Sequence, residues 1–453
     1  MKNSRLLSVV AATTLLPVIS AVQTPLASAS MCTAQSKSTV TPSTAATNDD
    51  ALSNFKGSSL GGFNLGSSSS GGNSTPTQTG VAKQLITTAG PTHSLQFITG
   101  PKSPDRTDKA WGITSTDLGV AYGDGSHTYF AFGDTGSCRT GDDGWRSNTL
   151  VRTSDKNYGD GITIDQALTR DGWTSSGTAK QFIPSLQAGN DDFTEVTTIP
   201  TAGIVIDGVH YVDYMSVKHW GDAGQWATNY AATMRSTDGG VHWDVVTDSV
   251  RVNNEASKNF DYIMPGKKGY ATGNENLQMS AFIEKDGYVY RFSTPNGRFG
   301  SAYLSRAPKD QFPAEDAFKY WDGSSWSDDA AAVSNPSAAL FGDRVSELSV
   351  TYNEYLGKYI AMYLVEGTGL VVRTADSLTG PWSDTRLLVS TSTVPDLYGG
   401  FVVPNQDDQN LYYVLTTWSE YNVYFMRTDL DFALENNITS DNIVGEEVVV
   451  PAQ

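Results

Sequence analysis

The sequence predicts an all-β protein, a five-bladed β-propeller, and three observations favour this fold. Pairs of apolar strands joined by short turns return five times along the chain, at intervals of roughly 50 to 85 residues. Third strands follow most of these pairs, and little of the sequence has helical periodicity. A turn motif typical of propeller blades also occurs at residues 236–243. Together these features predict repeated antiparallel sheets around a common centre.

The first residues have the features of an export signal. Lys2 and Arg5 precede the apolar run 6–19, and Ala27-Ser28-Ala29 supplies a small-residue cleavage site. We therefore expect residues 1–29 to be a signal peptide, too short to span a membrane, and no second stretch approaches that length. Residues 30–84 are rich in Ser, Thr and Gly and are expected to form a flexible tether. The protein is expected to be secreted or associated with the cell envelope.

Two cysteines, Cys32 and Cys138, leave two alternatives open. Cys32 would lie close to the new N-terminus after cleavage, but Met31 before it disfavours attachment of a lipid. In an exported protein a Cys32–Cys138 disulfide is permitted, although it would have to bridge the tether.

The predicted propeller domain covers residues 85–453. Its turns contain Asp-Gly or Gly-Lys pairs, which are typical of β-hairpins. Two short segments, 165–169 and 313–319, are helix candidates. The first strands of the five predicted pairs are 116–120, 200–206, 277–283, 347–352 and 398–403, and the second strands are 129–135, 209–217, 288–293, 359–365 and 410–417.

One motif has a specific structural meaning. The run Ser236-Thr237-Asp238-Gly239-Gly240-Val241-His242-Trp243 matches the Asp-box pattern, a turn between outer strands of sialidase-type propeller blades. The aspartate caps its own turn and the tryptophan packs into the blade, so the motif indicates fold and not function.

Composition excludes several classes of function. The net charge is −18 and the pI is about 4.6, so nucleic acid is not an expected partner. Five histidines, none at paired metal-ligand spacing, argue against a histidine-zinc site. We expect no cofactor, although scattered aspartates leave an oxygen-ligand calcium site open. The protein is expected to be a monomer.

Carboxylates at the ends of the predicted strands are the candidate catalytic residues. Asp117 begins the first inner strand, Asp134 ends the neighbouring strand, and Glu347 begins the fourth inner strand. Carboxyl groups gathered in one place acquire different pKa values, and glycoside hydrolysis needs one protonated and one ionised carboxyl group. The alternative is that Asp117 or Asp134 caps a turn or pairs with Arg146, and that Glu347 holds an arginine.

The remaining polar and aromatic residues near the strand ends suit a neutral sugar. Some follow the first hairpin, others lie on inner strands or on loops that leave them, and tryptophans on loops can stack on sugar rings. The predicted substrate-binding residues are Arg146, Asn148, Gln278, Arg298, Trp418 and Glu420.

Several of these segments, taken together, resemble a known family. They are Thr116-Asp117-Leu118-Gly119, Phe132-Gly133-Asp134-Thr135, Trp145-Arg146-Ser147-Asn148, Gly297-Arg298-Phe299-Gly300, Glu347-Leu348-Ser349-Val350-Thr351-Tyr352-Asn353 and Tyr398-Gly399-Gly400-Phe401. The pattern resembles the DUF4185 domain, which is associated with glycoside hydrolase family 183, over about residues 100 to 430. The family's acidic motif positions fall on Asp117 and Asp134.

The resemblance implies a five-bladed propeller that cleaves chains of α-linked D-arabinofuranose, the arabinan of arabinogalactan and lipoarabinomannan in actinobacterial cell envelopes. The expected activity is that of an endo-D-arabinanase, with D-arabinan as the partner. The alternative is a non-catalytic propeller lectin that binds the same kind of polysaccharide.

Overall fold

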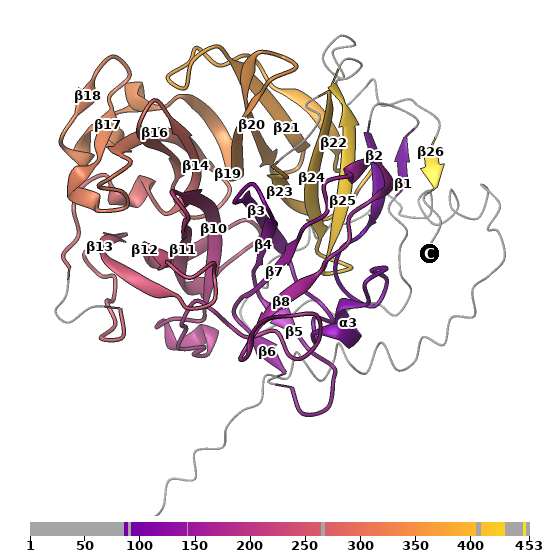
Figure 1. Ribbon diagram of the computed structural model, residues 1–453. Helices are drawn as coiled ribbons and strands as arrows, with labels where there is room; N and C mark the ends of the chain where they lie inside the picture. The colour runs from indigo at the N-terminus through magenta and orange to yellow at the C-terminus, as the bar shows by residue number, and fades with distance from the viewer. Residues whose placement is uncertain are drawn as a thin grey trace, which may run out of the picture.

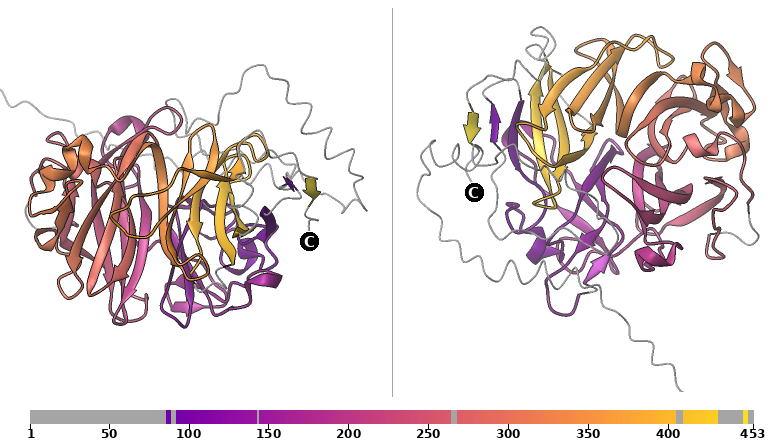
Figure 2. Two further views of the ribbon diagram at one scale, coloured as in Figure 1. Left: turned by 90° about the horizontal axis from the view of Figure 1, so that it is seen from above. Right: turned by 180° about the vertical axis from the view of Figure 1, so that it is seen from behind.

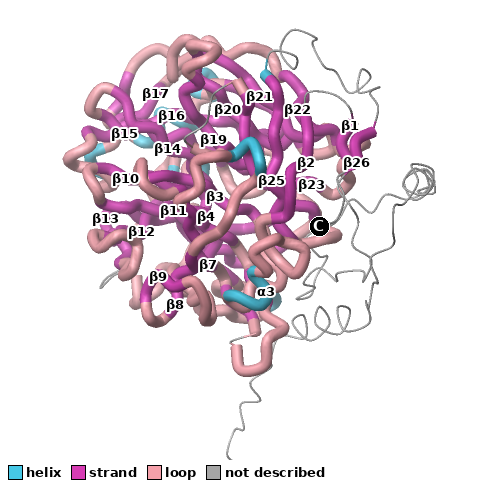
Figure 3. Tube along the Cα trace, turned by 45° about the vertical axis from the view of Figure 1, so that its right-hand side comes forward, coloured by secondary structure: helices cyan, strands magenta, loops and turns pink. Residues whose placement is uncertain are grey.

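The protein is all-β and built from antiparallel sheets (Figure 1). The computed structural model describes residues 86–88, 92–142, 144–263, 268–404, 409–430 and 447–449. The α-helix that is described over its whole length is α3 (Thr107–Ala110). Helical segments are short and lie in the connections between strands (Figure 3). The 3-10 turns are η1 (Tyr158–Asp160), η2 (Asn190–Asp192), η3 (Asn274–Asn276), η4 (Glu315–Ala317), η5 (Ala330–Ser334) and η6 (Pro336–Ala338).

The first half of the chain forms two of the sheets. Each follows the chain as a meander, in which every strand pairs with the one before it except where β5 and β6 intervene. The first sheet has the order β3 (Leu118–Gly123), β4 (Thr128–Phe132), β7 (Thr149–Thr153), β8 (Gln166–Thr169) and β9 (Gly172–Thr174). The second has the order β10 (Thr197–Ile206), β11 (Val209–Trp220), β12 (Trp226–Ser236) and β13 (Asp244–Val252). β5 (Thr135–Gly136) and β6 (Trp145–Arg146) pair separately.

The next strands belong to one nine-stranded sheet, because β16 pairs with β19. On either side of this pairing the strands again follow the chain. The members are β14 (Met279–Lys285), β15 (Tyr288–Thr294), β16 (Gly300–Pro308), β17 (Lys319–Trp321), β18 (Trp326–Ser327), β19 (Phe341–Asn353), β20 (Lys358–Val365), β21 (Gly369–Ala375) and β22 (Arg386–Ser390).

The last sheet joins the two ends of the folded part. Its order is β2 (Thr92–Phe97), β25 (Asn422–Asp429), β24 (Asn410–Thr417) and β23 (Leu397–Val402), so an early strand completes a sheet of late strands. In Figure 1 the indigo β2 lies beside the yellow β25. β1 (Ile86–Thr88) and β26 (Glu447–Val449) add a second pairing between early and late segments. Both pairings close the molecule.

We call β3, β10, β14, β19 and β23 the inner strands. Each contacts the next along the chain, and β23 returns to contact β3. Figures 1 and 2 show the sheets arranged around the region where these strands meet, with the strands running between two opposite ends of the molecule. The inner strands therefore bring their starting residues together at one end of the fold.

Local chemistry explains several of these elements. The turns Asp207-Gly208 and Asp286-Gly287 have positive φ at both residues, as two-residue hairpins of the twisted type require. In the predicted Asp-box, Asp238 Oδ1 accepts hydrogen bonds from the backbone of Val241 and His242, and the indole of Trp243 donates to the carbonyl of Gly240. The sequence predictions for these turns are confirmed.

Other predictions need correction or fall outside the described residues. The helix candidate at 165–169 is wrong, because Gln166–Thr169 is strand β8, paired with β7 and β9. Within 313–319 only the 3-10 turn η4 forms. The predicted signal peptide and nearly all of the predicted tether lie outside the described residues. Cys138 is disulfide-bonded, and Cys32, the other cysteine of the sequence, lies outside them.

Candidate active site

Three inner strands have an irregular register close to Asp117, Glu347 or Tyr398. The pairing of β3 shifts register directly after Asp117, that of β19 shifts around Glu347, and that of β23 shifts after Tyr398. Leu118, which follows Asp117, has a positive φ of 66°. Such bulges bend a strand and redirect its side chains, and they are frequent beside active sites. Here they accompany the meeting of residues from three inner strands.

Asp117 is held by a residue from the other end of the chain. The phenol of Tyr398 donates a hydrogen bond of 3.1 Å to Oδ2 of Asp117. Oδ1 is buried and has no hydrogen-bond partner among the described residues. Gly133 makes room for this oxygen, since a Cβ at Gly133 would lie 2.3 Å from it. One oxygen of the carboxyl group is thus fixed by a hydrogen bond, and the other is buried without one.

The pKa of Asp117 is raised to about 7, mainly because burial disfavours the charged form. Hydrogen bonding from Tyr398 and Tyr421 opposes the shift, while the negative charge of Glu347 adds to it and the positive charge of Arg298 reduces it. The result is a carboxyl group that changes charge near neutral pH.

Asp134 lies between β4 and β5, one residue after Gly133. Its Oδ1 accepts a hydrogen bond of 2.6 Å from Thr197 at the start of β10. Burial and then the charge of Asp117 raise the pKa of Asp134 well above its usual value, and the Thr197 bond only partly offsets this. The charge of Asp117 thus acts on Asp134, and this repulsion favours one ionised and one protonated carboxyl group.

Glu347 has a different environment from the two aspartates. Its carboxylate accepts from Arg298, whose Nη2 lies 3.0 Å from Oε1, and Nη1 of the same arginine lies 3.4 Å from Glu366. Burial would raise the pKa of Glu347, but the charge and hydrogen bonds of Arg298 outweigh it and lower that pKa. Glu347 therefore stays ionised, which suits a residue that tunes Asp117 better than one that donates a proton.

Aromatic rings surround Arg298. Its guanidinium lies 5.1 Å from the ring centre of Tyr398 and 5.7 Å from that of Trp226. Trp418 packs beside Tyr398 at 6.3 Å and beside Tyr421 at 5.8 Å between ring centres. The predicted residues Arg298 and Trp418 are therefore close neighbours of the residue that holds Asp117.

The side chains of Arg146 and Asn148, which were predicted to bind substrate, are buried inside the fold. Arg146 is 2% exposed and donates to the carbonyls of Ala179 and Gly112 at 2.6 Å. Asn148 is fully buried; its amide nitrogen donates to the carbonyls of Ile183 and Thr198, and its Oδ1 accepts from two backbone amides. Both side chains stabilise the backbone inside the fold and are not exposed at a substrate-binding surface. Their predicted role in binding substrate is therefore corrected.

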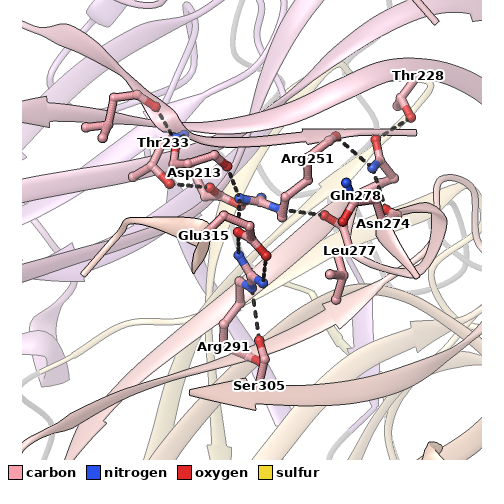
Figure 4. Close-up of polar contacts among 12 residues, drawn as sticks. Asp213, Thr228, Thr233, Arg251, Asn274, Leu277, Gln278, Arg291, Ser305 and Glu315 are labelled. Carbon is pink, nitrogen blue, oxygen red and sulfur yellow. Dashed lines mark hydrogen bonds and ion pairs between the residues drawn. The ribbon is translucent and has the colours of Figure 1, made fainter. Parts of the chain in front are cut away.

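The side chain of Gln278 is likewise buried and bonded within the protein (Figure 4). Its amide donates to the carbonyls of Arg251 and Asn274 and accepts from Thr228, and the side chain is fully buried. Arg251 in turn pairs with Asp213 at 2.5 Å within a network that continues through Glu315 to Arg291. The network links β11, β13 and β15, so the predicted contact of Gln278 with substrate is replaced by a contact within the protein.

Glu420, the last predicted substrate-binding residue, is 8% exposed and forms an ion pair of 3.3 Å with Lys102. This pair ties the β24–β25 turn to the segment before α3. It is a structural contact beside Tyr421.

Five neighbours of the site were not among the predicted site residues: Thr197, Glu366, Trp226, Tyr398 and Tyr421. Tyr421 and Trp226 had a signal, because both lie in or directly beside turns with other aromatic residues, and Tyr398 begins a predicted inner strand. Thr197 had none, since the strand it begins starts three residues before the predicted one. Glu366 follows β20 and is recognised only through its contact with Arg298.

No group of three or more His, Cys, Asp or Glu side chains in the described part of the chain is arranged to hold a metal ion. The same residues contain no helix long and apolar enough to cross a membrane.

Comparisons with solved structures find proteins of similar shape. One is a protein from Bacteroides ovatus ATCC 8483, with a TM-score of 0.49 and 11% identity, covering 73% of this chain and 89% of that one. Another is an exo-beta-1,3-galactanase from Phanerochaete chrysosporium, with a TM-score of 0.43 and 11% identity, covering 81% and 71%. A third is the Trypanosoma rangeli sialidase, with a TM-score of 0.39 and 13% identity, covering 72% and 48%.

A search of curated proteins finds no match to the chain. The family described as "Domain of unknown function (DUF4185)" matches residues 102–427, close to the span expected from the motifs. This match contains Asp117, Asp134, Arg298, Glu347, Tyr398 and Tyr421. The chain therefore belongs to the DUF4185 family.

Proposed function

We propose that this protein is a glycoside hydrolase that cleaves α-D-arabinofuranosyl linkages within arabinan chains, as expected for glycoside hydrolase family 183. The observation that carries the proposal is a pair of buried carboxyl groups with raised pKa values: burial chiefly raises the pKa of Asp117, and burial together with the charge of Asp117 raises that of Asp134. Glycoside hydrolysis requires such a pair in two protonation states.

The surroundings suggest which carboxyl group has which role. Asp117 receives the Tyr398 hydrogen bond and the favourable charge of Arg298, so it is the better anion. Asp134 is raised further by the charge of Asp117, so it is the better acid. Asp134 would protonate the leaving glycosidic oxygen while Asp117 activates water or attacks the anomeric carbon.

The charges around the pair favour a neutral substrate. Asp117, Glu347 and Glu366 all lie near Arg298, which already bonds to both glutamates. An anionic sugar would meet this excess of carboxylates without a free arginine to bind it. Arabinofuranose units carry no charge and suit such a site.

We further propose that the fold is a five-bladed propeller. The cycle of contacts through β3, β10, β14, β19 and β23 supports one blade for each inner strand. The nine-stranded sheet then corresponds to two blades joined where β16 meets β19. Secretion and attachment at the cell envelope, and a monomeric state, belong to the same proposal.

Incubation of the purified protein with soluble D-arabinan tests the function directly. Oligosaccharides should appear, and Asp117→Asn and Asp134→Asn should each reduce the rate by about 10²- to 10⁴-fold. Asp171→Asn, a change of an exposed aspartate in the β8–β9 turn, is the matched control and should leave the rate unchanged. Loss of less than about tenfold in Asp117→Asn would remove the proposed role of that residue. Binding of D-arabinan without release of products would instead indicate a lectin.

A further inference from the structure

Exposed apolar side chains are concentrated at one place in the described part of the molecule. Six large apolar side chains there are exposed, and four of them lie near the start of β10 or the β11–β12 turn: Leu186, Phe193, Tyr262 and Phe299. The other two, Tyr352 and Tyr355, lie at the β19–β20 turn, where an inner strand ends instead of beginning. Exposed apolar groups gathered in one place commonly mark a binding surface.

The rings at the end of β11 are held in position by Asn190. Its Oδ1 accepts from the backbone of Trp220 at 2.7 Å, and its amide donates to the carbonyl of the same residue at 3.1 Å. The backbone carbonyl of Asn190 also meets Nδ1 of His219 at 3.0 Å. His219 stacks on Phe193, with 4.3 Å between ring centres and 16° between planes. Phe193 is 48% exposed, so a flat ring pair faces outward on a rigid support.

The β11–β12 turn connects this ring pair to a second exposed ring. Trp220 packs against Trp226 across the turn, with 5.7 Å between ring centres. The backbone of Arg298 donates to the carbonyl of Gly224 at 2.9 Å. A Cβ at Gly224 would lie 3.1 Å from the ring of Phe299, which is 44% exposed. The loop that carries Arg298 is therefore docked on the turn that carries the tryptophans.

A series of side-chain contacts connects these rings to Asp117. Trp226 lies under Arg298, Arg298 lies over Tyr398, and Tyr398 bonds to Asp117. A ligand that occupies Asp117 and extends over Arg298 would next meet Phe299 and Trp220, while Trp226 is buried and packs against Trp220 from inside the fold. Beyond them it would meet the Phe193–His219 pair.

We propose that Phe193, His219, Trp220 and Phe299, supported by the buried Trp226, form an aromatic platform that binds further sugar units of the same glycan chain, on one side of the cleaved linkage. The proposal rests on the proposed function. It adds the path of the bound polymer, which runs from Asp117 across the end of the β10–β13 sheet. Flat aromatic rings suit the apolar C–H faces of uncharged sugars, and they lose little conformational entropy on binding. Such a platform would let the enzyme prefer the interior of long chains over short ones.

Two exposed rings provide the test. Phe193→Ala and Phe299→Ala remove side chains that are 48% and 44% exposed, so both variants should fold normally. With soluble D-arabinan, KM should rise about tenfold in the double variant, while kcat and KM for a D-arabinofuranose tetrasaccharide change by less than about twofold. Tyr355→Ala, a 45% exposed ring at the opposite end, is the control and should change neither substrate's kinetics.

Binding is measured in parallel with an Asp117→Asn background by affinity electrophoresis in gels that contain D-arabinan. The ring substitutions should weaken retardation, and Tyr355→Ala should not. Unchanged KM for the polymer and unchanged retardation would overturn the platform while leaving the hydrolase intact. Failure of the wild-type protein to cleave or bind D-arabinan would overturn both proposals. Sedimentation shows whether the wild-type protein is a dimer and whether the ring variants lose it. If they do, and their kinetics on the polymer are unaltered, these rings form an interface with a second copy of the chain, and the proposal that they bind glycan is overturned.

Discussion

The phenol of Tyr398 reaches Oδ2 of Asp117 at 3.1 Å, although 281 residues separate them in the chain. The contact joins the first inner strand to the last, so it forms only when the ring of sheets is closed. It also stabilises the charged form of the carboxyl group. Folding and the readiness of Asp117 to react are thus linked through one hydrogen bond.

Tyr398→Phe should move the pH dependence of the reaction upward. Removal of the phenol withdraws a bond that favours the carboxylate, so the pKa of Asp117 should rise above about 7. Because Asp117 must be ionised to act, activity at low pH should be lost earlier and the acidic limb of kcat/KM should shift by roughly one unit. A pH–rate profile measures the shift, with Tyr352→Phe at an exposed position as control. If the acidic limb of kcat/KM does not shift, the Tyr398 hydrogen bond does not control the pKa of Asp117.

Glu347→Gln should move the same limb in the opposite direction. The negative charge of Glu347 raises the pKa of Asp117, so its removal should lower that pKa and extend activity to more acidic pH. Arg298 keeps its contact with Glu366 in this variant. If Glu347 were the proton donor, the substitution would instead abolish activity at every pH, and the comparison of profiles distinguishes the two roles.

Asp134→Asn should make the protein more stable at alkaline pH while it inactivates the enzyme. A carboxyl group whose pKa is raised by folding stabilises the fold below its unfolded value and loses that contribution as pH rises through the folded value. The variant removes this loss, so its free energy of unfolding at pH 8 should exceed that of the wild type. Near pH 3 the two proteins should differ little. Chemical denaturation at both pH values checks this, and equal stability at pH 8 would contradict it.

Gly133→Ala should displace Asp117 without unfolding the protein. The added Cβ would lie 2.3 Å from Oδ1 of Asp117, far inside contact distance, so the carboxyl group must move. A displaced catalytic group typically costs about 10²-fold in rate. Gly269→Ala is the control, because a Cβ there meets no atom within 4 Å. Steady-state kinetics with circular dichroism make the measurement, and full activity in the Gly133 variant would show that the carboxyl group tolerates displacement.

Asp213→Ala should be among the more damaging changes to stability. It leaves the fully buried guanidinium of Arg251 with one remaining ion pair, the contact of 3.8 Å to Glu315, beside its hydrogen bonds to the carbonyls of Leu277 and Ser249. Loss of one partner from a buried ion pair costs about 3–5 kcal/mol. By contrast, Asp207→Ala breaks a surface pair with Lys309 and should have little effect on stability. Urea denaturation of both variants compares the two costs, and similar values would rule out a structural role for the network in Figure 4.

Much of the fold follows from local sequence. The turns at Asp207-Gly208 and Asp286-Gly287, the Asp-box at Asp238 and the alternation of apolar strands all depend on residues within a few positions of one another. Short-range geometry of this kind is encoded by residue type, because turn conformations and strand patterns have strong local preferences. The helix predicted at 165–169 failed because pairing with β7 and β9 outweighs a weak local preference.

The sequence by itself determined the all-β class, the hairpin turns and the candidacy of Asp117 and Asp134. Only the tertiary structure decided that Arg146, Asn148 and Gln278 are buried in the frame while Arg298 and Tyr398 lie at the catalytic pair. An arginine occurs in each group, so residue type alone does not distinguish Arg146 from Arg298. What separates them is the closure of the sheets, which buries some polar side chains against backbone carbonyls and turns others, at register shifts, toward Asp117. Burial and charge coupling arise from contacts between distant strands, and no local pattern encodes them.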